Sequence, residues 1–190
     1  MVAILTTGET ELVSRAQQGD RGAFSELARQ HYPGAVRIIH RMCGDVQLAE
    51  DATQEAFIRA WINLASLRPQ TSFRNWLYRI AVNAALDMLR RRQERSIEDE
   101  QIMMVTDQTP GPEAVVIQNE RMDQLHNAIQ LLPEAARSVL VLREYGDLSY
   151  QEIAGVLDIP IGTVMSRLNY ARTHLRKQLL VHLQMETENG

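Results

Sequence analysis

The sequence predicts an all-α protein of two small helical domains joined by a flexible acidic linker. Apolar residues recur at intervals of three and four along most of the 190-residue chain, as on one face of an amphipathic helix. The strict alternation of apolar and polar residues that is typical of a half-buried strand is absent. Between about residues 93 and 112 the helical period is lost, and a charged and then turn-rich segment indicates a linker.

Four helices are expected before the linker, because each apolar stretch is bounded by a capping or breaking residue. Gly44-Asp45 combines a helix stop with an N-cap, and Thr10 and Ser72 are the other expected caps. Pro33-Gly34 lies inside the second helix and is expected to kink or divide it. The expected ranges are about 10–18, 23–42, 46–64 and 73–92.

Four more helices are expected after the linker. Pro133 begins one of them at the position where its missing N–H costs least. Ser149, with Glu152 three residues later, predicts a capping box, and Thr163 is the expected cap of the last helix. A tight turn separates the last two helices, so the pair has the dimensions of a helix-turn-helix. The expected ranges are about 113–132, 134–145, 150–157 and 163–183.

The charges are segregated along the chain, although the formal net charge is only −4. Residues 68–95 hold seven arginines against two acidic residues, and residues 160–180 hold four basic residues and no acidic one. Residues 96–123 hold seven acidic residues against one arginine. Arginine suits phosphates and base edges because its guanidinium binds bidentately. The pattern indicates two nucleic-acid contacts, although two solvated helix faces would give the same charges.

The last helix has an apolar side and a polar side. The polar side presents small hydroxyls and amides between basic residues, a face that can enter a major groove and pair with base edges and phosphates. An amphipathic surface helix without a ligand is the alternative, but the preceding capped helix and tight turn favour DNA binding. The apolar stripe consists of Val164, Leu168, Ala171, Leu175 and Leu179.

Several other classes of protein are not indicated. With a single cysteine there is no disulfide framework, and Cys43 is expected to be a small buried residue instead of a metal or redox site with His40. No phosphate-binding loop, HExxH pair or Ser/His/Asp motif is present, so we expect no enzyme, catalytic residue, metal or cofactor. The first residues lack a basic n-region, and no run approaches the ~18 apolar residues of a membrane span. We expect a soluble, cytoplasmic protein with no membrane insertion.

Three segments, in order along the chain, resemble ECF-type sigma factors of the sigma-70 family. The longest is LPEAARSVLVLREYGDLSYQEIAGVLDIPIGTVMSRLNYAR, residues 132–172, which is similar to their C-terminal promoter-reading domain. DATQEAFIRAW (51–61) and SFRNWLYRIAVNAALDMLRRR (72–92) are similar to their core-binding and minus-ten-reading segments. The resemblance covers nearly the whole chain, and the acidic linker stands in the expected place. It implies three parts, namely a core-binding and minus-ten domain at 1–95, a linker at 96–119 and a minus-thirty-five domain at 120–185.

The implied function is that of an alternative sigma factor, which binds core RNA polymerase and directs initiation at specific promoter DNA. The resemblance also implies control by an anti-sigma factor, linked to the membrane. Two other functions were weighed: a stand-alone helix-turn-helix regulator, and a sigma-like decoy that binds an anti-sigma factor. The first is disfavoured because the N-terminal half carries a second DNA-type surface and no dimer seam. The second is disfavoured because the basic faces are retained.

The third helix carries a stripe of acidic and isoleucine residues on a side away from its core face. Acidic side chains beside exposed isoleucines suit a protein partner better than DNA. The resemblance implies that this partner is the clamp coiled coil of the largest RNA polymerase subunit. The expected core-binding residues are Asp51, Gln54, Glu55, Ile58, Arg59 and Ile62.

The fourth helix carries amides and guanidinium groups on one flank, which suit bases and phosphates. The resemblance implies that this flank reads and melts the minus-ten element, and that the loop Ser66–Thr71 holds a flipped base. Trp76 lies on the apolar face and is expected in the core. Asp87 is expected to pair with Arg90 or Arg91. The expected minus-ten residues are Arg68, Asn75, Tyr78, Arg79, Asn83 and Arg90.

The polar side of the last helix is implied to read the minus-thirty-five element. Met165 and Tyr170 depart from the family pattern, since a basic residue is frequent at both positions. Tyrosine can reach a phosphate through its hydroxyl or pack on a thymine methyl, but it adds no charge. The expected contact residues are Thr163, Ser166, Arg167, Asn169, Tyr170, Arg172 and Lys177.

Overall fold

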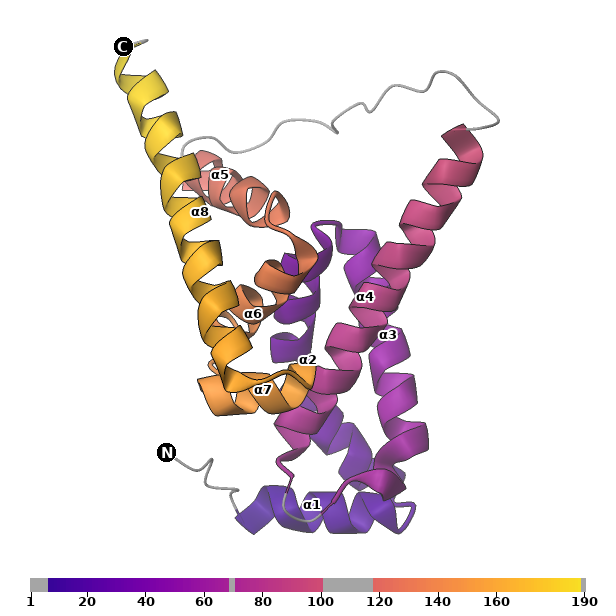
Figure 1. Cartoon of the computed structure of the whole chain (residues 1–190). Coiled ribbons are helices and arrows are strands. Elements are labelled where there is room, and N and C mark those ends of the chain that lie inside the picture. The colour runs from indigo at the N-terminus through magenta and orange to yellow at the C-terminus, as the bar shows by residue number, and fades with distance from the viewer. Residues whose placement is uncertain (1–6, 69–70, 101–117, 189–190) are drawn as a thin grey trace.

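All of the described secondary structure is helical. The computed structural model of the chain describes residues 7–68, 71–100 and 118–188, and these ranges contain helices and turns but no strand (Figure 1). The all-α class predicted from the sequence is confirmed. The helices are α1 (Thr7–Gln17), α2 (Arg21–Cys43), α3 (Val46–Asn63), the 3-10 turn η1 (Leu64–Ser66), α4 (Phe73–Glu100), α5 (Gln118–Gln130), α6 (Glu134–Glu144), α7 (Tyr150–Leu157) and α8 (Ile161–Glu188).

Two helix boundaries follow directly from local sequence. Gly44 adopts φ 74° and ends α2, and the Asp45 side chain then caps α3 by accepting the Leu48 N–H at 2.9 Å. The capping box predicted for α7 is present. The Glu152 N–H donates to the Ser149 hydroxyl, and the Glu152 carboxylate accepts the Ser149 N–H at 2.8 Å.

Other helix ends differ from the prediction. α1 begins at Thr7, so Thr10 lies inside the helix and is not its cap. α8 begins at Ile161, because the Pro160 carbonyl accepts the N–H of Thr163 at 2.9 Å, which places Thr163 in the first turn and not at the cap. α4 extends beyond the expected end near 92 to residue 100, since no glycine or proline interrupts the chain there. The predicted linker residues 101–117 lie outside the described residues.

α2 is one continuous helix through Pro33, so the expected division does not occur. Pro33 is exposed, and water can therefore bond the carbonyl that its missing N–H leaves unpaired. At the next residue, Gly34, the Tyr78 hydroxyl occupies the place where a Cβ atom would stand. This close approach packs α2 against α4 and holds the helix together on both sides of the proline.

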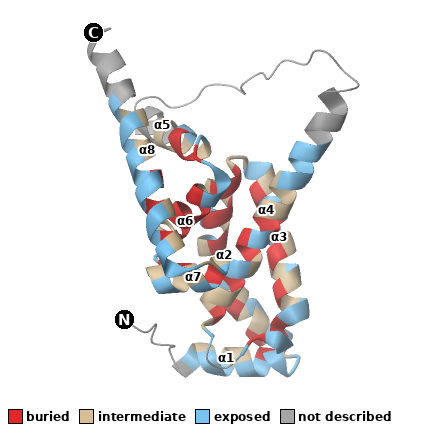
Figure 2. Ribbon diagram, viewed as in Figure 1, coloured by how far each residue is buried: buried red, intermediate tan, exposed pale blue. Residues whose placement is uncertain are grey.

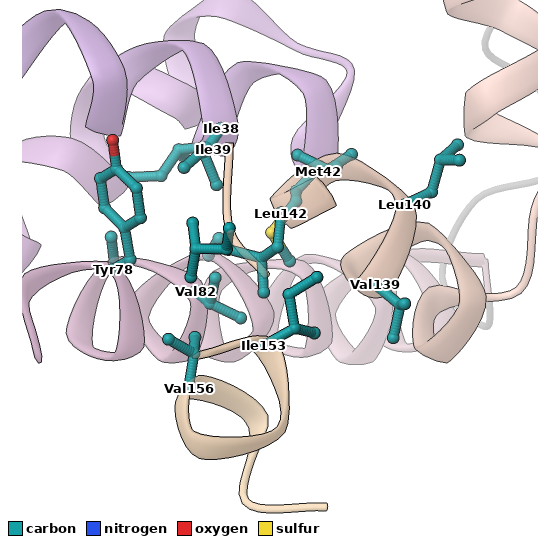
Figure 3. Close-up of a cluster of buried hydrophobic side chains, with 14 of the residues drawn as sticks. Ile38, Ile39, Met42, Tyr78, Val82, Val139, Leu140, Leu142, Ile153 and Val156 are labelled. Carbon is teal, nitrogen blue, oxygen red and sulfur yellow. The ribbon is translucent and has the colours of Figure 1, made fainter. Parts of the chain in front are cut away.

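The core consists of two hydrophobic clusters. The smaller cluster contains residues of α1, α2, α3, α4 and η1, such as Leu27, Phe73 and Leu77. The larger contains residues of the N-terminal half (α1–α4) and of the C-terminal half (α5–α8). Figure 3 shows side chains of α2 and α4 converging with those of α6 and α7, and Figure 2 shows buried residues gathered where these helices meet. The labelled members are Ile38, Ile39, Met42, Tyr78, Val82, Val139, Leu140, Leu142, Ile153 and Val156.

The two halves are therefore packed against each other, and their contact is called the seam below. At one end of the seam, α7 lies against α4. At the other end, α5 and α6 lie against α2. The exposure of several candidate functional residues depends on whether they lie in this seam.

Candidate functional site

The acidic and isoleucine stripe of α3 faces outward, as predicted. Ile58 is 55% exposed and Ile62 70% exposed, and Asp51 and Gln54 are also exposed. The opposite side of α3 is lined with small residues that pack into the core, namely Ala49, Ala52, Thr53, Ala56 and Ala60. Because these side chains are small, α2 and α4 approach α3 closely and cover this side of it. The stripe is therefore the broad side of α3 that stays exposed in the described structure.

Arg59 is held at the edge of this stripe by two carboxylates. Its guanidinium donates to Glu55 at 2.8 Å and to Asp87 at 3.0 Å, and these hydrogen bonds raise the pKa of Arg59. Asp87 was expected to pair with Arg90 or Arg91, and this expectation is wrong. Because α3 and α4 lie side by side, Asp87 faces α3 and bonds across the pair of helices.

A polar cavity of about 810 Å³ lies along the flank of α4. Four of the six expected minus-ten residues line it, namely Arg68, Asn75, Arg79 and Asn83. Ser66 and Thr71, from the loop expected to hold a flipped base, also line it, whereas residues 69–70 lie outside the described residues. The cavity combines arginines, amides and hydroxyls in one place, which is chemistry suited to a nucleotide base and its phosphates.

Tyr78, one of the six expected minus-ten residues, is buried in this structure and does not line the cavity. Its side chain is only 5% exposed, because it lies in the larger cluster with its hydroxyl against Gly34. Burial raises the pKa of this phenol. Arg90 is exposed but does not line the cavity, and its guanidinium lies 3.9 Å from the Glu134 carboxylate. Trp76, expected in the core, is only half-buried and lines the cavity.

The second wall of the cavity belongs to α7, which the sequence did not indicate. Glu152, Gly155 and Val156 line this wall. The Glu152 carboxylate accepts a hydrogen bond from the Asn75 amide at 3.0 Å and lies 3.5 Å from the Arg74 guanidinium. Burial alone would raise the pKa of Glu152, but the hydrogen bonds from Asn75 and Ser149, with the charge of Arg74, hold that pKa below its usual value.

The outward side of α8 presents most of the expected minus-thirty-five residues. Val164, Leu168 and Ala171 of the predicted apolar stripe are buried, whereas Leu175 and Leu179 are half-buried. Thr163 and Arg167 are half-buried at the edge of the polar side. The exposed members are Ser166, Asn169, Tyr170, Arg172 and Lys177.

Two contacts on α8 were not foreseen. Arg172 donates to the Glu144 carboxylate at 2.8 Å, and this hydrogen bond raises the pKa of Arg172. Tyr170 stacks on His174 with ring centroids 5.8 Å apart. No local motif announces the first contact, because Glu144 belongs to α6 and meets α8 only in the folded domain.

The far end of the seam is closed by polar contacts to the last carbonyls of α2. Arg137 donates to the Met42 carbonyl at 2.8 Å, and Gln130 donates to the Arg41 carbonyl at 2.9 Å. Cys43 is buried here, as predicted, and burial raises the pKa of its thiol to about 12. His40 stacks on His126 with ring centroids 5.4 Å apart.

Neither a membrane span nor a metal-ligand cluster is found in the described part of the chain. No helix there combines the length and the apolarity needed to cross a bilayer. Histidine, cysteine and acidic side chains do not gather there in groups of three or more that would suit a metal ion.

Comparison with known proteins defines the class. The sequence profile of sigma-70 region 2 matches residues 27–95, and the profile of sigma-70 region 4 matches residues 122–175. The chain is 37% identical to the RNA polymerase sigma-H factor of Pseudomonas aeruginosa, over 90% of this chain and 93% of that protein. It is also 37% identical to the ECF RNA polymerase sigma-E factor of Escherichia coli K12, over 85% and 88% of the two chains. The chain belongs to the ECF sigma factors of the sigma-70 family.

Two solved structures share the fold. One is CnrH in complex with the cytosolic domain of CnrY, with a TM-score of 0.71 and 24% identity over 92% of this chain and 98% of that one. The other is the sigma factor RpoE in complex with the anti-sigma factor NepR from Bartonella quintana, with a TM-score of 0.69 and 22% identity over 83% and 97% of the chains.

Proposed function

We propose that this chain is an alternative sigma factor in which residues 1–95 bind core RNA polymerase and open the minus-ten element, and residues 120–185 read the minus-thirty-five element. The observation that carries the proposal is the joint presence of regions 2 and 4 on one chain, each with an outward polar face. A stand-alone helix-turn-helix regulator does not account for region 2. The chain itself performs no catalysis in this proposal, and it acts in the cytoplasm.

Core binding is assigned to the outward stripe of α3. The stripe is available in the described structure, and its isoleucines offer apolar area between carboxylates. Such a surface fits a partner helix that carries basic residues around an apolar centre. Arg59 positions Glu55 and Asp87 and contributes at the edge of the stripe.

Minus-ten recognition is assigned to the α4 cavity, and minus-thirty-five recognition to the outward side of α8. In the cavity, Asn75 and Asn83 supply amide donors for base edges, and the arginines supply donors for phosphates. Arg90, which is exposed on α4 outside the cavity, is a further phosphate contact. Of the basic residues on α8, Arg167 stands nearest to the helix start, the part of a recognition helix that enters a major groove.

Control by an anti-sigma factor is part of the proposal. RpoE, which shares this fold, was solved in complex with the anti-sigma factor NepR, and CnrH was solved in complex with the cytosolic domain of CnrY. We extend that control to this chain and keep the expectation that the anti-sigma factor is linked to the membrane.

Run-off transcription tests the proposal. Purified core polymerase is combined with the full chain and a template library randomised at the minus-thirty-five and minus-ten positions. We expect transcripts that start at a fixed distance from a selected pair of elements, and none of these with core polymerase alone. Transcription that is no more selective than that of core polymerase alone contradicts the assignment.

A further inference from the structure

We propose that the free chain is closed by its own helix-turn-helix, with α7 forming a wall along the minus-ten-reading flank of α4 and occupying its Asn75 while the α3 stripe stays open. This inference rests on the function proposed for α4 above. It implies an order of events, because the polymerase-facing surface is ready in the closed form and the DNA-facing surface is not.

The closure uses carboxylates where DNA would place phosphates and base edges. Glu152 accepts from the Asn75 amide at 3.0 Å and faces Arg74 at 3.5 Å. Asp158, at the end of α7, lies 3.8 Å from the Arg79 guanidinium. The Asn75 N–H that donates to Glu152 is not free to donate to a nucleic acid, and the two carboxylates offset part of the charge of Arg74 and Arg79. These two carboxylates are called the α7 latch below.

Apolar packing supports the latch. Val156 and Ile153 of α7 are buried in the cluster that also contains Val82 of α4 and Ile38 of α2 (Figure 3). Exposed ion pairs alone contribute little to stability, so the buried side chains supply most of the attraction between the halves. Opening the seam exposes these side chains to water, so their burial favours the closed form.

The far end of the seam adds a second hold on the same closed arrangement. Arg137 and Gln130 bond the last carbonyls of α2, and Cys43 beside them is only 8% exposed. Gln130 also lies directly against Gly44. Separation of the halves therefore removes the cover of this end of α2. The native cysteine becomes a reporter of opening, without any introduced label.

The α3 stripe lies outside all of these contacts. Ile58 and Ile62 are more than half exposed in the closed form. Polymerase can therefore dock on α3 first, and withdrawal of α7 from α4 follows. A ligand that binds the open form shifts the equilibrium from the closed to the open form. The extent of the shift is set by the difference between its affinities for the two forms.

The central test is Glu152→Lys in the full chain. The new ammonium faces Arg74 and Asn75. It repels the Arg74 guanidinium and cannot accept the Asn75 hydrogen bond, so the seam is expected to open. Two control variants separate this effect from trivial ones. Glu144→Lys makes the same charge change on α6, away from the seam, and Ser149→Ala removes the cap of α7 but leaves the contact between Glu152 and Asn75.

Two measurements are made on each variant. Fluorescence anisotropy reports binding of a labelled single-stranded minus-ten oligonucleotide, and neutral iodoacetamide reports exposure of Cys43. We expect Glu152→Lys to bind the oligonucleotide about tenfold more tightly than Glu144→Lys, which corresponds to a difference of about 1.4 kcal/mol. We expect its Cys43 to be alkylated at least severalfold faster than in either control.

A second pair of variants guards against a folding defect in Glu152→Lys. Gly155 lines the cavity from α7, and a Cβ there meets nothing within 4 Å. Gly155→Arg improves helix propensity and places a cation in the cavity that Arg79 also lines, so alkylation of Cys43 should accelerate. Gly155→Glu adds a carboxylate at the same position, so alkylation should slow.

The outcomes are decisive in each direction. Equal affinity and equal alkylation in Glu152→Lys and its controls overturn the closure, as do equal rates in the two Gly155 variants. Faster alkylation without tighter oligonucleotide binding shows that the seam opens but does not mask α4, which also overturns the proposal. Run-off transcription with the wild-type chain reports the proposed function separately, because it does not depend on the state of the seam before polymerase binds.

Discussion

The outward stripe of α3 and the flank of α4 belong to neighbouring helices, yet the free chain presents them differently. The stripe stands open to solvent, with Ile62 70% exposed. The flank is walled by α7, and its Asn75 amide is already bonded to Glu152. Both surfaces carry polar side chains that can bind a partner, so their difference in exposure does not come from polarity. It comes from a contact with a part of the chain that lies far away in sequence.

The largest expected effect concerns the open surface. Asp51→Lys should weaken binding to core polymerase by about tenfold or more, because it reverses an exposed charge within the assigned interface. Its free energy of unfolding should change by less than about half a kcal/mol, since Asp51 is exposed. Competition for core polymerase measures the first effect, and urea unfolding the second. Glu11→Lys, an equal charge change at an exposed position of α1, should compete as the wild type does, and equal losses in both variants would contradict the interface.

The next effect distinguishes the two amides of the covered surface. In transcription by the holoenzyme, Asn75→Ala and Asn83→Ala should each cost about tenfold at promoters with the preferred minus-ten sequence, as expected for the loss of a base contact of 1–3 kcal/mol. In oligonucleotide binding by the free chain, Asn83→Ala should weaken binding and Asn75→Ala should not. The reason is that Glu152 occupies Asn75, whereas Asn83 is exposed. Equal losses in the free chain would show that α7 does not restrict access to Asn75.

The third prediction concerns α8, where Arg172 is bonded to Glu144 and Arg167, five residues earlier, is half-buried. Arg167→Ala should flatten the base preference at one minus-thirty-five position, at a cost of about 1–3 kcal/mol. Arg172→Ala should lower transcription from all templates alike and by less, because Glu144 already neutralises much of that charge. Templates with single-base changes measure both effects. If Arg172→Ala, and not Arg167→Ala, changes the base preference, the assigned roles are reversed.

The smallest effect is a dependence of the seam on pH. Burial lowers the pKa of His40, and the neighbouring His126 and Arg41 lower it further. Asp45 opposes this shift only in part. A histidine whose folded pKa is depressed stabilises the fold above its unfolded pKa of about 6.5, and this contribution is lost as the pH falls through the folded value.

Between pH 7.5 and 5.5, the closed form should therefore weaken modestly. The readout is protection of the α2 end from hydrogen exchange, corrected for the intrinsic pH dependence of exchange. His40→Gln should reduce this pH dependence, whereas His174→Gln on α8 should leave it unchanged. An unchanged pH dependence in His40→Gln assigns the effect to another group.

Local sequence predicted the parts of this structure that depend on neighbours in the chain. The capping box of Ser149 and Glu152, the stop at Gly44 and the outward stripe of α3 all arise from residues within a few positions of one another. The helical period identifies one buried face for each helix. It therefore works best for α3, which has a single broad buried side.

The errors occur where a helix is buried on more than one side. α4 packs against α2, α3 and α7, so Tyr78 is buried on a second face that the period does not reveal. Asn75 and Glu152 lie 77 positions apart, and no motif in either segment refers to the other. The same holds for Asp87, which bonds Arg59 across two helices in place of an arginine nearby in sequence. Such contacts are set by tertiary packing and are not encoded in any local pattern.

Glu152 serves two structures with one carboxylate, and this sharing limits how the protein can change over evolutionary time. One oxygen completes the cap of α7 by accepting from Ser149, and the other receives the Asn75 amide. A substitution at Glu152 that relaxes closure also weakens the helix-turn-helix, so selection on either property constrains the other. Asp158 is also constrained, because it ends α7 in the left-handed conformation with φ 55°, whereas Gly155 takes part in neither cap. Among descendants of this sequence, the strength of closure should therefore drift through Gly155 while Glu152 stays fixed.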